Sequence, residues 1–225
     1  MNMTDNNTRH GYPGLLIVIE GTDGSGRSSQ ISRLRDWLAI ESYGVRISEW
    51  QTSRLMGRVI DRAKEQNLLN ATTFSLAYAA DFADRLEREI IPALKSGLIV
   101  LTDRYTYTAY ARDIVRGTSP EWVRKLYSFA PKPDLVFYLN VPVDVLLKRI
   151  ITTTGFEYYE SCKDIGLSTD FYESFKIYQI RIMNEYAKMS EEFNFIAIEA
   201  TKSKHEIQNE IRSSIKTILD TGILR

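Results

Sequence analysis

The stretch IEGTDGSGRSSQ, from Ile19 to Gln30, decides the fold of this chain. A continuous apolar run at 15–19 leads into it, and residues 28–42 after it repeat apolar side chains with helical spacing. A glycine-rich turn between a buried strand and a helix is typical of a phosphate-binding loop, because its backbone N–H groups and the helix N-terminus attract anions. Residues 21–28 match the pattern G-x-x-x-x-G-[K]-[ST] at every fixed position except one, where Arg27 replaces lysine.

The loop is predicted to hold the phosphates of ATP, and its candidate binding residues are Gly21, Thr22, Asp23, Gly24, Ser25, Gly26, Arg27, Ser28 and Ser29. The hydroxyl of Ser28, or of Ser29 beside it, is a candidate ligand for Mg²⁺. Arg27 keeps the positive charge of lysine, but a guanidinium is a planar fork and not a compact point charge. Arg27 is therefore either catalytic or the mark of a loop that binds nucleotide without turnover. The plainest alternative is a glycine turn that only starts a helix.

Composition bounds the class of protein. With 225 residues, 44% hydrophobic and 26% charged, the chain is expected to form one globular domain over residues 1–225. Lys+Arg 29 balances Asp+Glu 29, which gives no indication of a nucleic acid or a membrane surface as partner. Cys162 is the single cysteine, which fits a cytoplasmic protein without disulfides. Residues 1–13 are polar and are interpreted as a flexible tail, and no apolar run is long enough to cross a membrane.

Apolar runs alternate with helix-period segments along the chain. The runs at 15–19, 99–101, 135–139 and 195–198, with a weaker one at 45–48, are predicted strands. Helical spacing occurs at 28–42, 73–95, 119–129, 143–151, 171–193 and 204–219. This alternation implies a three-layer α/β fold, with a five-stranded parallel sheet and helices on both of its faces.

Residues 152–169 (TTTGFEYYESCKDIGLST) follow neither period and contain two glycines. A segment of this length without regular structure inside a compact domain is usually functional, so it is predicted to be a lid. An ordinary surface excursion is the alternative interpretation.

Polar side chains follow the predicted strands at their carboxyl ends, namely Asp23, Glu49, Asp103 and Arg104. In an open α/β sheet the ligand lies beyond these ends, so the four side chains are expected to converge on one crevice. The alternative for Asp103 and Arg104 is a structural ion pair that caps a helix.

Three segments, in order and spacing, resemble the thymidylate kinases: the loop, LTDRYTYTAY from Leu101, and PKPDLVFYLNVPVDVLLKR from Pro131 to Arg149. The resemblance implies a P-loop kinase fold, a homodimer, and transfer of a phosphoryl group from ATP to dTMP with Mg²⁺. It implies that Asp103 organises the magnesium and the phosphates, as Ser28 also would, and that Arg104 steadies the acceptor phosphate or the transferring group. Asp103 and Arg104, together with the loop residues Asp23 and Arg27, form the candidate catalytic set.

The acceptor side departs from the family pattern, in which an aromatic residue that stacks on thymine is followed four residues later by an arginine that grips the acceptor phosphate. Here Tyr78 is followed by Phe82, and an arginine comes one turn later, as Arg85. These side chains share one helical face, so Arg85 is predicted to hold the phosphate, and a buried aromatic stripe with an exposed arginine is the alternative. Trp50 and Arg54 in SEWQTSR stand where the family has an arginine-proline element, and Glu49 precedes them.

Further positions follow from the resemblance. Arg149 would lie against the adenine, although a solvated arginine at a helix end would look the same. Tyr105, Thr108 and Tyr110 would line the thymine pocket. Many family members carry an arginine at the position of Ser25 or in the lid, whereas this chain has none between residues 150 and 180, so Arg27 is a candidate for the missing guanidinium. Three hypotheses stand: a thymidylate kinase, a kinase of another deoxynucleoside monophosphate or of a nucleoside, and a regulatory or structural nucleotide-binding protein of the same fold without turnover.

Overall fold

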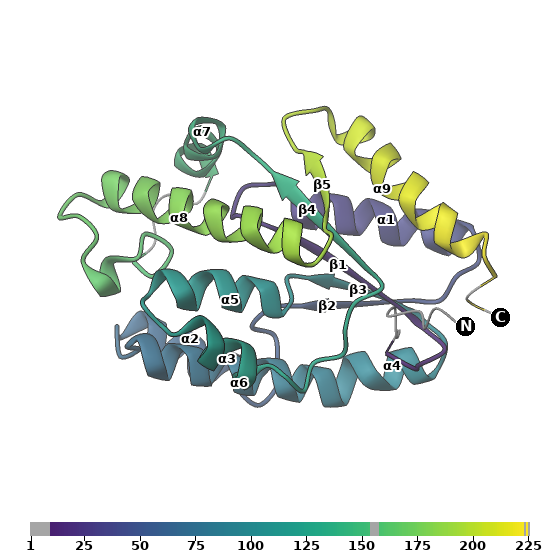
Figure 1. The fold of residues 1–225 in the computed structure, drawn as a ribbon, viewed down its shortest axis with the longest axis horizontal. Helices are drawn as coiled ribbons and strands as arrows, with labels where there is room; N and C mark the ends of the chain where they lie inside the picture. The colour runs from purple at the N-terminus through teal and green to yellow at the C-terminus, as the bar shows by residue number, and fades with distance from the viewer. Residues whose placement is uncertain (1–9, 154–157, 223, 225) are drawn as a thin grey trace, which may run out of the picture.

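The computed structural model describes residues 10–153, 158–222 and 224. Its centre is a five-stranded parallel sheet in the order β2-β3-β1-β4-β5 (Figure 1). The strands are β1 (Leu15–Gly21), β2 (Val45–Glu49), β3 (Ile99–Asp103), β4 (Leu135–Asn140) and β5 (Ile196–Glu199). Strand β1 is buried along its whole length, which explains its nearly continuous apolar sequence.

Helices pack on both faces of the sheet (Figure 1). They are α1 (Arg27–Ile40), α2 (Gly57–Glu65), α3 (Ala71–Arg85), α4 (Ile91–Lys95), α5 (Thr106–Val115), α6 (Pro120–Leu126), α7 (Val143–Thr153), α8 (Phe171–Glu192) and α9 (Lys204–Leu219). One apolar core joins Leu15, Ile17 and Ile19 of β1 to α1, α7 and α9. The other joins Leu16 and Val18 to α3, α5, α6 and α8. The predicted three-layer α/β fold is confirmed.

The predicted helix at 73–95 is one continuous helical stretch. It begins at α3, where the side chain of Asn70 accepts a hydrogen bond from the backbone N–H of Thr73 in a capping box. It then passes through one turn of π-helix, η1 (Leu86–Ile90), into α4. Pro92 has no N–H to donate to the preceding turn, and the wider turn lies directly before it.

Periodicity missed two helices, α2 and α5. Helix α2 buries only Gly57 and Ile60, so it carries too few apolar side chains for a recognisable stripe. Helix α5 is rich in threonine and tyrosine, which have low helix propensity, and it forms because most of its residues are buried between α3, α8 and the sheet.

The two irregular segments that the sequence predicts, the tail and the lid, are each described in part. Residues 10–13 of the predicted flexible tail include His10, whose buried Nε2 lies 2.9 Å from Oδ2 of Asp134, so this part is fastened to the sheet. Residues 1–9 of that tail, and 154–157 of the predicted lid, lie outside the described residues. Residues 158–169 form turns and a short 3₁₀-helix, η2 (Lys163–Ile165). Among the described helices, none is both long enough and apolar enough to cross a membrane.

Candidate active site

The glycine-rich loop joins β1 to α1 at the carboxyl edge of the sheet. Gly26 is the N-cap of α1 with a φ of 96°, and no side chain of the described residues caps this helix. The first backbone N–H groups of α1 are therefore left for a ligand, and the positive end of the helix dipole favours a phosphate there. Ser28 and Ser29 are exposed in the same turn.

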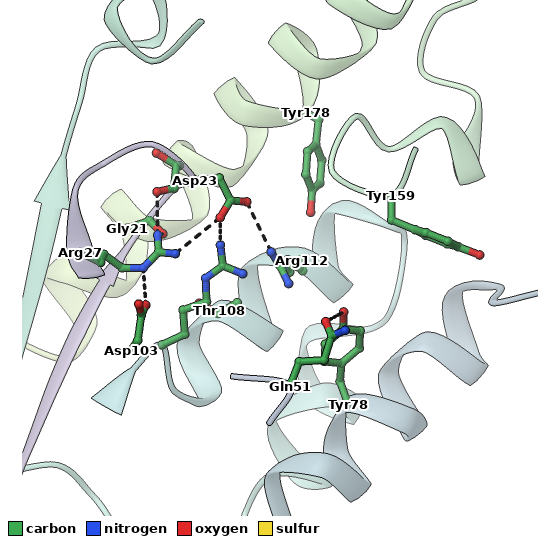
Figure 2. Close-up of polar contacts among 12 residues, drawn as sticks. Gly21, Asp23, Arg27, Gln51, Tyr78, Asp103, Thr108, Arg112, Tyr159 and Tyr178 are labelled. Atoms are coloured by element: carbon green, nitrogen blue, oxygen red, sulfur yellow. Dashed lines mark hydrogen bonds and ion pairs between the residues drawn. The ribbon is translucent and has the colours of Figure 1, made fainter. Parts of the chain in front are cut away.

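The guanidinium of Arg27 is turned back onto the loop and onto β3 (Figure 2). Its Nε donates to Oδ1 of Asp103 at 2.6 Å, and its Nη1 donates to the carbonyl oxygens of Thr22, at 2.6 Å, and Gly21. Its Nη2 lies 3.5 Å from Oδ1 of Asp23. These contacts use most of the five N–H donors of a buried guanidinium, a planar arrangement that lysine cannot reproduce. Arg27 thus fixes the shape of the loop and the orientation of Asp103.

Asp103 and Ser28 offer oxygen ligands at the first turn of α1. The Oγ of Ser28 donates to Oδ2 of Asp103 at 3.1 Å, and Asp103 stands opposite Glu49 in the register of β2 and β3. Mg²⁺ in phosphoryl-transfer sites is held by one or two protein oxygens together with phosphates and water. Ser28 and Asp103 fit this requirement. Within the described ranges, no group of three or more His, Cys, Asp or Glu residues is placed to hold a metal.

Asp23 is the meeting point of arginines from three elements (Figure 2). Besides Arg27 of α1, its carboxylate accepts a hydrogen bond from Nη2 of Arg104, which follows β3. Nη2 of Arg112 in α5 lies 3.6 Å from its Oδ2. Of the four side chains expected to converge, Asp23, Asp103 and Arg104 come together here, whereas Glu49 is exposed on β2. The structure pairs Asp103 with Arg27, and Arg104 with Asp23, instead of Asp103 with Arg104.

Two adjoining cavities open beside the loop, and Arg104, Arg112 and Tyr178 line both of them. The first is bounded by loop residues 21–23, by Thr108 of α5 and by α8. The second is lined mainly by polar and aromatic side chains, namely Gln51, Lys64, Phe74, Tyr78, Arg116, Tyr159 and Glu160. Cations at the junction suit a phosphate, and aromatic faces in the second cavity suit a base.

The aromatic wall of the second cavity is built around Tyr78. Its ring lies 4.5 Å from that of Phe74 and stacks on Trp50, with centroids 5.9 Å apart. Its hydroxyl donates to Oε1 of Gln51 at 2.7 Å (Figure 2). Tyr78 and Trp50 thus form one apolar unit, and the stacking of Tyr78 on a base stays a prediction.

Phe82 and Arg85 do not line either cavity. Phe82 is fully buried and packs against Tyr105 and Tyr127. Arg85 is also buried, and its Nη2 donates to Oγ of Ser48 at 3.1 Å while its Nη1 lies 3.7 Å from Asp81. Burial lowers the pKa of Arg85. This arrangement supports a positioning role for Arg85 and not the direct grip on the acceptor phosphate that the sequence suggested.

The buried pair of Asp81 and Arg85 holds the loop after β2 in place. The carboxylate of Asp81 accepts hydrogen bonds from the backbone N–H groups of Gln51, at 3.1 Å, and Ser53, at 3.0 Å. Gln51 has a φ of 63°, so this carboxylate stabilises a backbone conformation that glutamine seldom adopts. Asp81 and Arg85 therefore hold Gln51 at the edge of the second cavity.

Other candidate acceptor residues are dispersed. The hydroxyl of Tyr105 donates to the carbonyl of Pro131 at 2.8 Å, and Tyr110 packs edge-on against Tyr107 and Tyr127, so neither lines the two cavities. Glu49 is exposed. Arg54 is exposed as well and lines a separate hollow with Arg46 and Arg88.

Thr108 lines the first cavity, but its hydroxyl is committed to a buried carboxylate. Glu20 of β1 is fully buried and accepts hydrogen bonds from Oγ1 of Thr108 and from the hydroxyl of Tyr186, each at 2.7 Å. It also accepts from the backbone N–H of Tyr105 at 2.8 Å. Burial raises the pKa of Glu20. This network fixes the start of α5, and with it the direction of Arg104.

Arg149 lies on the opposite side of the loop. Its Nη1 donates to the carbonyl of Gly24 at 3.0 Å, and its Nη2 donates to that of Ala200 at 3.1 Å. The guanidinium therefore lies beside the glycine-rich loop and does not line either of the two cavities, and its role at the adenine stays a prediction.

Arg116 joins the segment 158–165 to α5. Its Nε donates to Oδ2 of Asp164 at 2.8 Å, its Nη2 to the carbonyl of Tyr159 at 2.6 Å, and its Nη1 to the hydroxyl of Tyr178 at 2.9 Å. The hydroxyl of Tyr159 accepts in turn from the N–H of Leu69 at 3.0 Å. Because Tyr159 and Glu160 line the second cavity, this part of the predicted lid forms one of its walls.

Sequence reasoning missed Arg112, Arg116, Gln51, Tyr178 and Glu20. Arg112 and Arg116 are four residues apart on the helix after Arg104, so a signal existed, but α5 itself was not expected. Glu20 carries a signal too, since a glutamate inside a buried strand requires partners.

The sheet order, the loop at the end of β1 and the polar side chains at the strand ends define a P-loop kinase fold. Residues 19–211 match the family model described as thymidylate kinase. The chain is 43% identical over 212 residues to "Probable thymidylate kinase 2" of Saccharolobus solfataricus, covering 93% of this chain and 99% of that protein. It is 32% identical to "Probable thymidylate kinase" of Pyrococcus horikoshii, covering 90% and 96%. The chain belongs to the thymidylate kinase family.

Proposed function

We propose that this chain transfers the γ-phosphoryl group of ATP to dTMP, giving ADP and dTDP. The observation that carries the proposal is the pair of adjoining cavities, which run from the phosphate-binding loop to an aromatic wall and share two arginines at their junction. A monophosphate whose base lies against Phe74 and Tyr78 would present its phosphate to the loop, where the γ-phosphate of ATP lies. Family membership supports this acceptor.

Most of the chemistry is positioning and charge neutralisation. The N–H groups of the loop and of the first turn of α1 hold the phosphates of ATP. Arg27 keeps the loop and Asp103 in place, and Arg104 neutralises charge on the transferring or acceptor phosphate. Asp23 orients Arg104. Bound Mg²⁺, held by Ser28 and Asp103, would supply further neutralisation of phosphate charge.

A coupled ADP-release assay with ATP, Mg²⁺ and a panel of nucleoside monophosphates tests the proposal. We expect dTMP to give the highest kcat/KM. Release of ADP at the same low rate with every monophosphate and with none would refute it, and calorimetry with ATP and Mg²⁺ would then separate a binding-only protein from an inactive preparation.

The burial of Phe82 favours a second candidate, a kinase of another nucleoside monophosphate. The family arginine at this position is absent, and nothing on α3 replaces it in the cavity lining of the described residues. The same panel decides this, because another monophosphate would then exceed dTMP in kcat/KM.

The protein forms a homodimer, supported by the exposed apolar side chains Leu55, Val59, Leu68 and Leu76 on and beside α2 and α3. It works in the cytoplasm on small nucleotides, without nucleic-acid or membrane partners, as its single, buried cysteine and balanced charge suggest.

A further inference from the structure

Arg112 stands at the junction of the two cavities with few contacts of its own. Its side chain is 14% exposed, and its ion-pair partner among the described residues is Asp23, at 3.6 Å, which is longer than a hydrogen bond. Arg116, one turn later, is bound by Asp164, Tyr159 and Tyr178. Of these two arginines, Arg112 is the one with N–H donors to offer to a ligand.

The described side chains that line the two cavities include the cations Lys64, Arg104, Arg112 and Arg116 but only the carboxylates Asp23 and Glu160. Asp23 faces Arg104 and Arg112, and Arg27 approaches it as well. Nε of Arg104 is buried and has no hydrogen-bond partner among the described residues. Burial, followed by the neighbouring charge of Arg112, lowers the pKa of Arg104 to about 10. Two guanidiniums that share one carboxylate partner are stabilised by a further anion.

The place of the junction indicates which anion that is. The first cavity touches the loop at Gly21, Thr22 and Asp23, where the terminal phosphate of ATP is expected, and the second ends in aromatic side chains. An acceptor nucleotide must bring its phosphate to the first and its base to the second, because in-line transfer needs the two phosphates in contact.

We propose that Arg112 binds the 5′-phosphate of the acceptor nucleotide together with Arg104, a role that rests on the proposed function. The cation that the family pattern places on α3, at the position of Phe82, is thereby supplied from α5. Phe82 packs edge-on against Tyr105, the residue that leads from β3 into α5. Figure 2 shows Arg112 between Asp23 on one side and Gln51, Tyr78, Tyr159 and Tyr178 on the other.

The test compares dTMP with thymidine, which lacks the phosphate, as ligands of the full chain. In wild type, calorimetry should give much tighter binding of dTMP. In Arg112→Met, the advantage of dTMP over thymidine should fall by about tenfold to a hundredfold, since a charge-assisted hydrogen bond pair is lost. Thymidine affinity and the KM for ATP should stay within about threefold, whereas the KM for dTMP rises.

Two variants complete the design. Arg112→Lys keeps the charge and should recover part of the advantage of dTMP over thymidine. Arg35→Met removes an exposed arginine of α1 and should change neither the affinity for dTMP nor the affinity for thymidine. Equal weakening of dTMP and thymidine by Arg112→Met, or no weakening, would overturn the phosphate role. If wild type binds dTMP tightly but transfers nothing to it, the proposed function fails while the dTMP-to-thymidine ratio still tests Arg112. A wild type that binds neither ligand overturns both.

Discussion

At the scale of single residues, Arg27 shows how a substitution inside a motif changes its chemistry. A lysine offers its charge at one point, while Arg27 spreads four contacts over Gly21, Thr22, Asp23 and Asp103. The loop is thus fastened to β3 by a planar side chain. The altered motif therefore points to a rebuilt site and not to a degenerate one.

Replacing Arg27 should slow phosphoryl transfer. We expect Arg27→Met to lose on the order of a hundredfold in kcat, because Asp103 and the loop carbonyls lose their partner, and Arg27→Lys to recover only part of it. Single-turnover transfer rates measure this, with Arg33→Met on the exposed side of α1 as control. A Met variant as fast as wild type would show that Arg27 is dispensable.

Gly26 should be essential for ATP binding. A Cβ at this residue would meet no protein atom within 4 Å, so its cost comes from the φ of 96° and from the phosphate that the loop encloses. Gly26→Ala should weaken binding of ATP with Mg²⁺ by roughly tenfold or more in calorimetry. Gly117→Ala, at a φ of 90° with the same open surroundings, carries the backbone strain alone and should leave ATP affinity unchanged.

At the scale of elements, α5 organises the acceptor side. It begins on the Glu20 network, presents Arg112 to both cavities, and ends at Arg116, which holds the segment 158–165. One helix therefore connects the junction of the two cavities, the aromatic side chains of the second cavity and the predicted lid. The contacts of α5 can be tested separately by single substitutions.

The lid attachment should depend on the buried ion pair of Arg116 and Asp164, whose side chains are 1% and 4% exposed. Arg116→Met leaves Asp164 buried without its charge partner, which should cost about 3–5 kcal/mol in the free energy of unfolding. In Arg116→Met, the rate of amide hydrogen exchange should increase more in residues 158–165 than in the strands. The double variant Arg116→Met with Asp164→Leu should recover stability. Unchanged hydrogen exchange in Arg116→Met would contradict the role of this ion pair in holding residues 158–165.

The interior of α5 should make stability pH-dependent. Burial raises the pKa of Asp113 from 3.8 to about 6, and one of its oxygens has no hydrogen-bond partner among the described residues. Between these values the folded state binds more protons than the unfolded state, so stability falls as the pH rises from 4 to 6. The difference corresponds to roughly 3 kcal/mol above pH 6. Asp113→Asn should therefore stabilise the protein at pH 7 but not at pH 3.5 in urea unfolding, and equal effects at both pH values would exclude this cause.

At the scale of the whole molecule, the face around α2 and α3 exposes apolar side chains that a monomer would leave in water. Leu55 is 63% exposed, Val59 55% and Leu76 48%. The same helix α3 carries Tyr78 on its inner side, so association of two copies would also brace the acceptor cavity.

The dimer should be sensitive to charge on this face. Wild type is expected to have twice the mass of the 25.9 kDa chain in light scattering at tens of micromolar. Val59→Glu combined with Leu76→Glu should give the monomer mass, because two buried carboxylates without partners oppose association. Ile40→Glu, at an exposed residue of α1, is the matched control. A monomeric wild type would rule out the homodimer.

The sequence by itself determined the loop, the five strands and the layer architecture, because those signals lie in contiguous residues: glycines between an apolar run and a helical period at 19–30. Which arginines lie beside the loop follows from the tertiary structure alone. Arg27, Arg104 and Arg112 meet at Asp23 only because the start of α1, the end of β3 and helix α5 lie together beside the loop that follows β1. Arg85 shares a helical face with Tyr78, but packing against Ser48 turns it into the core. Helical spacing predicts on which face of a helix a side chain lies, whereas the residue that it contacts depends on the element packed against that face.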